Sequence, residues 1–564
     1  MSTTPMGKDF DSKPSSNYSA DPKETPGQEG QPIIDYNTRN ASDDREAYAD
    51  GDVLVRAPLQ RRLKGRHVTF IGFGGGIGVG VYVASGAALA TAGPAGLLLA
   101  YALMGTVSWA LMQSVGEITT LLPSAGNFPH FATLFVDRSL GFGMGWNYFL
   151  GSGLSVASEL SAAAVLIGYW SSLNSAIWIT VCLVPMIAVN FAAVKWYGET
   201  EVVTASIKII TFVVLIILGI ILDLGGGPKH DRIGFRYWND PGAFNTYPGV
   251  TGSLGRFLAF FNTFINAAYS YTGGEVVILA AAECTDPHKQ IPRAVRRIVY
   301  RIVFFYVIGV IIIGMLVPYT DSRLTSGTDN AASSPFVVAI ENAGISVLPS
   351  IFNAAVLISA WSAGNTYIYA GSRSLVALSL SGHAPRFLSK ASRNGIPYWS
   401  VACTSAFGFL AYLSAGSGGA PQAFDWLQDI TALTYLLTWG ALCFTYIRFY
   451  AALKSQGISR DSLPWKSMFQ PYLAWYGLLM CTIIVLFSGF PVFMKGNWNA
   501  SDFVADYISI PLFFIPIAGW KIYKRTKMVK ASEADLYTGR LEADYEVPDK
   551  PPTTWWGKFL DWLL

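Results

Sequence analysis

Three ionisable residues stand inside long apolar stretches of the sequence: Glu159 in LSVASELSAAA, Lys208 in TASIKIITF and Glu275 in GGEVVILAAA. A charge at the centre of a lipid bilayer costs about 2.5–3.5 kcal/mol on insertion scales, so such residues are candidates for function. Because removal from water lets these groups exchange a proton near neutral pH, we predict that Lys208, Glu275 and Glu159 couple the protein to a proton gradient. The alternatives are a Lys208 side chain that reaches the membrane surface and glutamates that hydrogen-bond between helices.

Glycine interrupts two of the apolar stretches. The segment IGFGGGIGVGVY at 71–82 contains six glycines, and YSYTGGEVV contains Gly273 and Gly274. Each glycine costs a helix interior about 1 kcal/mol relative to alanine, and non-helical backbone inside a membrane is tolerated where it is buried or lines a cavity. Two interrupted spans at matching positions indicate an inverted-repeat transporter with a site near the middle of the membrane. Close helix packing through small residues is the alternative.

The interrupted backbone predicts a site for a zwitterion. Free N–H groups at the start of the half-helix near Gly78 and Gly80 suit a carboxylate, and carbonyl groups near Gly76 and from Tyr269 to Thr272 suit an ammonium group. One site for both groups describes an α-amino acid. The predicted substrate-binding residues are Gly76, Ile77, Gly78, Val79, Gly80, Tyr269, Ser270 and Thr272.

The elements that must position these residues are membrane-spanning helices. Of the 564 residues, 52% are hydrophobic and 14% are charged, against roughly 25% charged residues in soluble domains. Runs of about 20 mostly apolar residues, together with Lys and Arg concentrated in alternate connecting segments, predict twelve spans with both chain ends in the cytoplasm. The expected spans are 67–89, 96–121, 142–170, 176–194, 203–223, 256–282, 301–319, 348–380, 398–415, 424–450, 471–493 and 503–522. The net charge of +3 gives no argument for nucleic acid, and the five cysteines predict neither disulfides nor a metal site.

The spans divide the chain into three parts. Residues 1–55 are polar and predict a disordered cytoplasmic tail, in which Lys8, Lys13 and Lys23 are candidate sites for ubiquitin ligase machinery, with solvated charge as the alternative. Residues 56–525 form the transporter domain, with a first repeat at about 67–223, a second at about 256–450 and two further helices at about 471–522. Residues 526–564 form a cytoplasmic tail ending in TTWWGKFLDWLL, which predicts an amphipathic helix on membrane lipid or against the protein's own loops.

Four further polar residues stand near span ends or inside spans. Arg301 and Arg373 belong to basic groups that flank the cytoplasmic ends of spans. Glu117 in SVGEITTLLPSAG is expected in a surface salt bridge or an intracellular gate, and Asn365 in SAGNTYIYAGSR is expected to bond between helices or to contact substrate.

Several long motifs, in this order, resemble the fungal amino acid permeases of the amino acid–polyamine–organocation superfamily. They are RHVTFIGFGGGIGVGVYVASG, GPAGLLLAYALMG, GEITTLLPSAGNF, LGFGMGWNYF, YSYTGGEVVILAAAECTDPHKQIPRAVRRIVYRI and SRSLVALSLSGHAPRFLSKASRNGIPYWSV, within about residues 64–540. The resemblance implies an all-α integral membrane protein of twelve transmembrane helices, with a LeuT-like 5+5 inverted repeat and broken helices 1 and 6. It implies carboxylate-binding amides at Gly78, Val79 and Gly80, and ammonium-binding carbonyls at Gly76, Tyr269 and Thr272. It also implies proton coupling through Lys208 and Glu275.

The resemblance also implies an activity. We expect a secondary active transporter in the plasma membrane that takes up neutral amino acids of fairly broad range, driven by the proton gradient without a cofactor. Gly76 and Val79 stand where the family usually has threonines, which leaves the preferred amino acid open. The alternatives are a carnitine- or polyamine-type permease, which GGGPKHDRIGFRYW resembles, and an amino-acid-sensing receptor of the same fold with little transport. No enzyme is expected, because the sequence has no spaced His, Cys or Ser constellation and no nucleotide loop.

Overall fold

The computed structural model describes residues 63–537 apart from 64, 124–127, 193, 285, 325–333, 393–394 and 416–419. The elements of this part are helices, joined at one point by an isolated bridge between Leu63 and Cys284. The predicted tail over 1–55, with its candidate ubiquitin sites, and the predicted amphipathic end TTWWGKFLDWLL lie outside the described residues.

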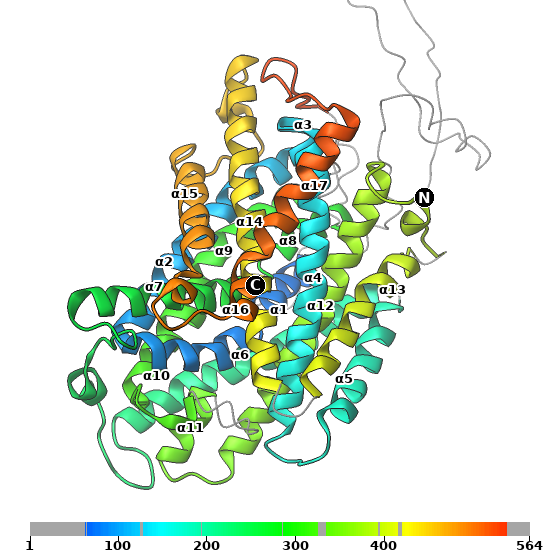
Figure 1. The fold of residues 1–564 in the computed structure, drawn as a ribbon. Coiled ribbons are helices and arrows are strands. Elements are labelled where there is room, and N and C mark those ends of the chain that lie inside the picture. Colours follow the sequence, from blue (N-terminus) through cyan, green and yellow to red (C-terminus); the bar gives the residue numbers. More distant parts are fainter. Residues whose placement is uncertain are drawn as a thin grey trace, which may run out of the picture. The chain divides into compact units, whose positions relative to one another are not determined.

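The helices of the first half are α1 (Gly65–Gly76), α2 (Ser85–Leu121), α3 (Phe128–Phe135), α4 (Arg138–Ile167), α5 (Ser175–Asn190), α6 (Val194–Asp223), α7 (Gly252–Tyr271) and α8 (Val276–Ala280). Those of the second half are α9 (Pro287–Arg301), α10 (Gly309–Leu316), α11 (Pro335–Asn342), α12 (Leu348–Leu380), α13 (Tyr398–Ala406), α14 (Ala420–Ser455), α15 (Tyr472–Phe487), α16 (Ala500–Tyr507) and α17 (Ser509–Lys524). The long helix α4 packs against α12, α14 and α17, and α2 packs against α7 (Figure 1).

Six helical stretches of the described chain are long and apolar enough to cross a membrane, or seven if the bent pair α16 and α17 is one span. The six are Gly80–Leu121, Arg138–Ile167, Trp196–Asp223, Pro287–Leu316, Phe424–Ser455 and Tyr472–Phe493. The expected spans 67–89 and 96–121 are divided differently here. The first expected span is interrupted at 77–79. The helical backbone that resumes at Gly80 continues through α2 into the second expected span, with a bend at Gly93, where φ is 74°.

Two arginines of the basic groups that flank the expected spans, Arg301 and Arg373, are buried against other parts of the protein. Arg301 at the end of α9 is 3% exposed. Arg373 in α12 is 6% exposed and donates from Nε to Glu283 Oε1 at 2.9 Å. The pattern of basic residues along the chain does not reveal which of them turn inward, because that depends on partners far along the chain, such as Gly72 for Arg301 and Glu283 for Arg373.

Glu117 near the end of α2 is also buried, which corrects the prediction of a surface salt bridge. Arg460 donates from Nε and Nη2 to the two oxygens of Glu117 at 2.9 and 2.7 Å. The backbone N–H and the hydroxyl of Ser467 donate to Glu117 Oε2 at 2.8 and 2.5 Å. These four bonds fix the segment after α14 to the end of α2.

The segment after α17 lies across the ends of several helices. The Val529 N–H donates to the Val136 carbonyl at 2.8 Å, Arg448 Nη2 donates to the Val529 carbonyl at 2.6 Å, and Leu536 is fully buried. Asp137, which caps α4, receives bonds from Lys521 Nζ at 2.5 Å and from the Thr526 hydroxyl at 2.6 Å. Asp137 therefore joins the start of α4 to the end of α17.

We expect the Asp137→Asn variant to be less stable at neutral pH. Burial alone would raise the pKa of Asp137, but hydrogen bonds from Lys521, Thr526 and Ser139 outweigh it and lower the pKa from 3.8 to about 2. The charged carboxylate therefore stabilises the fold above its ordinary pKa, and this contribution disappears as the pH falls towards 2. Asparagine also caps helices well, so the substitution removes mainly the charge. Thermal unfolding of the purified protein should show a loss on the order of 2 °C at pH 7, which shrinks on acidification.

Asp461→Asn is the matched control for this prediction. Asp461 pairs with Lys466 at 2.5 Å, but the side chain of Asp461 is 76% exposed, and exposed pairs contribute little to stability. An equal loss in both variants would contradict the role given to Asp137.

Candidate binding site at the two helix breaks

The two glycine-rich stretches are interrupted in the structure and meet each other. The helix α1 ends at Gly76 and helical backbone resumes as a π-helical turn at Gly80–Ala84, while α7 ends at Tyr271 and α8 begins at Val276. A Cβ on Gly75 would lie 2.7 Å from the Gly273 carbonyl oxygen, and a Cβ on Gly273, where φ is 85°, would lie 2.2 Å from the Gly75 carbonyl oxygen. The glycines therefore allow both the breaks and a backbone-to-backbone crossing of the two segments.

Lys208 of α6 is bonded to the first break. Its side chain is fully buried and Nζ donates to the Gly74 carbonyl at 2.6 Å. The alternative of a Lys208 side chain that reaches the membrane surface is therefore wrong. An ammonium group on a carbonyl of α1 ties α6 to the end of the half-helix, and this bond is strengthened because one partner is charged.

Glu201 lies beside Lys208, and the sequence analysis missed it. Glu201 is fully buried, and its charge acts on Lys208. The Ser362 hydroxyl donates to Glu201 Oε1 at 2.9 Å, and a Cβ on Gly74 would lie 1.6 Å from the same oxygen. Glu201 stands seven residues before Lys208 in ETEVVTASIK, a spacing that puts both on one face of a helix. This spacing could have identified Glu201 from the sequence, but the expected span 203–223 begins after it.

Glu159 of α4 faces the predicted carboxylate-binding amides. A Cβ on Gly78 would lie 2.5 Å from Glu159 Oε1, and the carboxyl interacts with the Val79 backbone N–H and with the Tyr269 side chain. Among the described residues, Glu159 Oε2 has no hydrogen-bond partner although it is buried. Three of the predicted groups, Gly78, Val79 and Tyr269, are therefore brought together around a carboxyl group of the protein.

The other predicted binding groups lie at the breaks but already have partners. The Gly76 carbonyl accepts a bond from the Tyr306 hydroxyl, and the Ile77 carbonyl accepts one from Ser359 at 2.8 Å. The Thr272 hydroxyl and N–H donate to the Tyr269 carbonyl at 2.7 and 3.2 Å. Gly80 packs on Ser270, whose hydroxyl lies 2.9 Å from the Tyr101 hydroxyl. Since a carbonyl oxygen can accept two bonds, the bonds from Tyr306 and Ser359 do not by themselves fill the Gly76 and Ile77 carbonyls.

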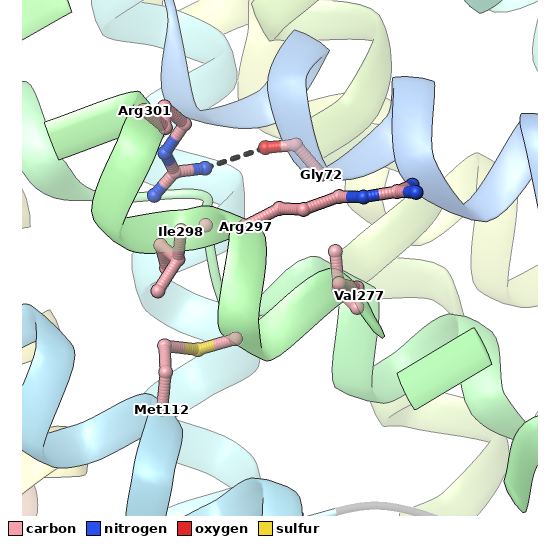
Figure 2. Close-up of a pocket in the computed structure, with 8 residues that line it drawn as sticks. Gly72, Met112, Val277, Arg297, Ile298 and Arg301 are labelled. Carbon is pink, nitrogen blue, oxygen red and sulfur yellow. Dashed lines mark hydrogen bonds between the residues drawn. The ribbon is translucent and has the colours of Figure 1, made fainter. Parts of the chain in front are cut away.

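Glu275 and Asn365 lie deep in the same region. Glu275 is 2% exposed, and its Oε1 accepts from the Tyr148 hydroxyl at 3.4 Å and from the Gly273 N–H at 3.3 Å. Asn365 Oδ1 accepts from Asn190 Nδ2 at 2.6 Å, which joins α12 to α5 and confirms the expected bond between helices. A cavity of about 20 Å³ beside the breaks is lined by residues that include Gly72, Gly274 and Arg301 (Figure 2), which is room for about one water molecule.

Apolar helices long enough to cross a membrane, with buried charges gathered at two interrupted helices, define a multi-pass membrane protein with a polar interior site. Comparison with protein families matches residues 67–533 to the family described as "Amino acid permease". The chain belongs to this amino acid permease family.

Relatives named for different amino acids match the chain about equally well. A "Proline-specific permease" of Emericella nidulans is 39% identical over 91% of this chain and 95% of the relative. A "Basic amino-acid permease" of Saccharomyces cerevisiae is 41% identical over 93% and 92%, and a "Dicarboxylic amino acid permease" of the same yeast is 40% identical over 90% and 84%. These relatives are transporters rather than enzymes, and they support amino acid transport by this chain.

Proposed function

We propose that this protein takes up neutral amino acids of fairly broad range by proton-coupled alternating access. It is proposed to act in the plasma membrane, with twelve spans in a LeuT-like 5+5 repeat and both chain ends in the cytoplasm. The observation that carries the proposal is the crossing of two interrupted helices at Gly75 and Gly273, where a Cβ on Gly273 would lie 2.2 Å from the Gly75 carbonyl oxygen. Paired breaks at matching positions favour alternating access around a site between them.

The groups at the breaks suit both poles of an amino acid. The proposed carboxylate site is formed by the N–H groups of Gly78, Val79 and Gly80, where helical backbone resumes. The proposed ammonium site is formed by backbone carbonyls at Gly76 and at 270–272, together with the unpartnered oxygen of Glu159. The Tyr269 carbonyl already accepts two bonds from Thr272, so Tyr269 is proposed to contribute its side chain. An ammonium group there would supply the donor that Glu159 Oε2 lacks among the described residues.

Lys208 is the proposed coupling residue. Its ammonium lies on the Gly74 carbonyl at 2.6 Å and takes the place that a sodium ion could have as a brace between two helices. Loss of the proton leaves a weaker, neutral donor and thereby loosens α6 from α1. Glu275 and Glu159, which are 2% exposed, are the proposed carboxyl groups that share in proton exchange.

Uptake of labelled amino acids into cells that lack their own permeases tests this function. We expect saturable uptake of neutral amino acids that a protonophore reduces by at least about tenfold. The competition panel contains neutral, basic and acidic amino acids, a polyamine and carnitine. Stronger competition by carnitine or a polyamine would replace the amino acid proposal with the corresponding permease. Binding with normal surface expression but negligible uptake would favour a receptor.

A further inference from the structure

Arg301 is a buried cation that the proposed transport cycle does not yet use. It ends α9, lies inside the candidate span Pro287–Leu316 and is 3% exposed. Its Nη1 donates to the Gly72 carbonyl of α1 at 2.6 Å. Figure 2 shows the guanidinium turned towards Gly72 across the gap between the two helices.

One edge of this guanidinium is left free. Nε and Nη2 of Arg301 have no hydrogen-bond partner among the described residues, although both atoms are buried. A buried donor without a partner loses its bonds to water without replacement and destabilises the fold. The N–H groups of Nε and Nη2 form the fork that receives both oxygens of a carboxylate in two parallel bonds. The chemistry of this free edge therefore points to a carboxylate.

Glu275 follows directly after the residue that lies against this free edge. It follows Gly274, where a Cβ would lie 2.3 Å from Arg301 Nη2, and the charge of Arg301 acts on the Glu275 carboxyl. The present bonds of Glu275, at 3.4 Å to the Tyr148 hydroxyl and 3.3 Å to the Gly273 N–H, are longer than the usual 2.7–3.2 Å. Glu275, which also interacts with its own backbone N–H, therefore has no short bond to another residue among these contacts and feels the charge of an incompletely bonded arginine.

We propose that Arg301 is a positioning residue whose free fork receives the Glu275 carboxylate in a second conformation of the transport cycle. Pairing draws the start of α8 towards the end of α9 and replaces the long bonds of Glu275 with two short, charged ones. A cavity of about 20 Å³, lined by residues that include Gly72, Gly274 and Arg301, lies beside the guanidinium. The inference rests on the proposed transport function, because it assigns the pair to one step of that cycle.

The variants Arg301→Lys, Glu275→Gln and their combination test the pair. Lysine keeps the charge and the possible bond to Gly72 but lacks the fork. We expect each single variant to lower the initial uptake rate about tenfold while amino-acid-induced thermal stabilisation of the purified protein is retained. The double variant should also lose about tenfold rather than a hundredfold, because both changes remove one interaction. Arg448→Lys is the matched control, since Arg448 Nη2 donates to the Val529 carbonyl at the same 2.6 Å.

Melting temperatures without substrate, measured for the wild type, the two single variants and the double variant, provide a readout that is independent of transport. A double variant whose change in uptake or in melting temperature differs from the sum of the two single changes supports the pairing of Arg301 with Glu275. Additive changes in both measurements, or wild-type uptake by Arg301→Lys, overturn it. If the wild-type protein takes up no amino acid in the panel, the proposed function fails, and non-additivity of the melting temperatures alone then decides the pair.

Discussion

Replacement of Gly273 by alanine is expected to abolish uptake. Its φ of 85° lies in the left-handed region, where a residue with a Cβ loses roughly 1–2 kcal/mol. The added Cβ would also lie 2.2 Å from the Gly75 carbonyl oxygen and 2.6 Å from its carbon. Because the obstacle is backbone rather than a flexible side chain, the two breaks cannot keep their crossing. Initial uptake rate and surface expression measure the effect, and we expect uptake to fall to background.

Gly249→Ala is the matched control for this variant. Gly249 has a similar φ of 79°, but no described atom lies within 4 Å of an added Cβ. The Gly249→Ala variant therefore has an alanine at positive φ without the close contact to a backbone carbonyl. We expect Gly249→Ala to retain at least about half of the wild-type uptake. Similar losses in both variants would mean that strain alone explains the result, and the crossing would lose its assigned role.

Replacement of Lys208 by methionine is the second large expected effect and should abolish uptake against a concentration gradient. The variant loses the bond of 2.6 Å to Gly74 and leaves Glu201, which is fully buried, without the nearby positive charge. A buried charge left without compensation destabilises a fold, so low expression is also expected. Accumulation of labelled amino acid with and without a protonophore provides the measurement.

Two further variants separate coupling from folding. The double variant Lys208→Met/Glu201→Gln removes both charges, and we expect it to restore surface expression but not protonophore-sensitive accumulation. Lys229→Met removes a lysine that also donates to a backbone carbonyl at 2.6 Å, that of Asn342, in an exposed position, and should behave like the wild type. Protonophore-sensitive accumulation by the double variant would show that Lys208 is not the coupling residue.

The sequence was sufficient to locate the breaks and the charges inserted into apolar stretches. Glycine clusters at 71–82 and at 273–274 identify both interruptions, because glycine weakens a helix wherever it stands. Lys208, Glu159 and Glu275 stand out against apolar neighbours for an equally local reason. The sequence did not predict the partners of these groups: Glu201 on Lys208, Tyr306 on the Gly76 carbonyl, and Arg301 between the two breaks.

The breaks and the inserted charges could be predicted, and their partners could not, because the two depend on residues at different distances along the chain. Composition, apolar runs and glycine positions act within a few residues, so the sequence by itself determined that the chain is a helical membrane protein with two broken helices. Burial of Arg301, Arg373 and Glu117 depends on residues between 90 and 350 positions away, such as Gly72, Glu283 and Ser467. Tertiary packing decided which charges turn inward and which backbone groups they bind, because that choice depends on helices that meet far apart in the chain.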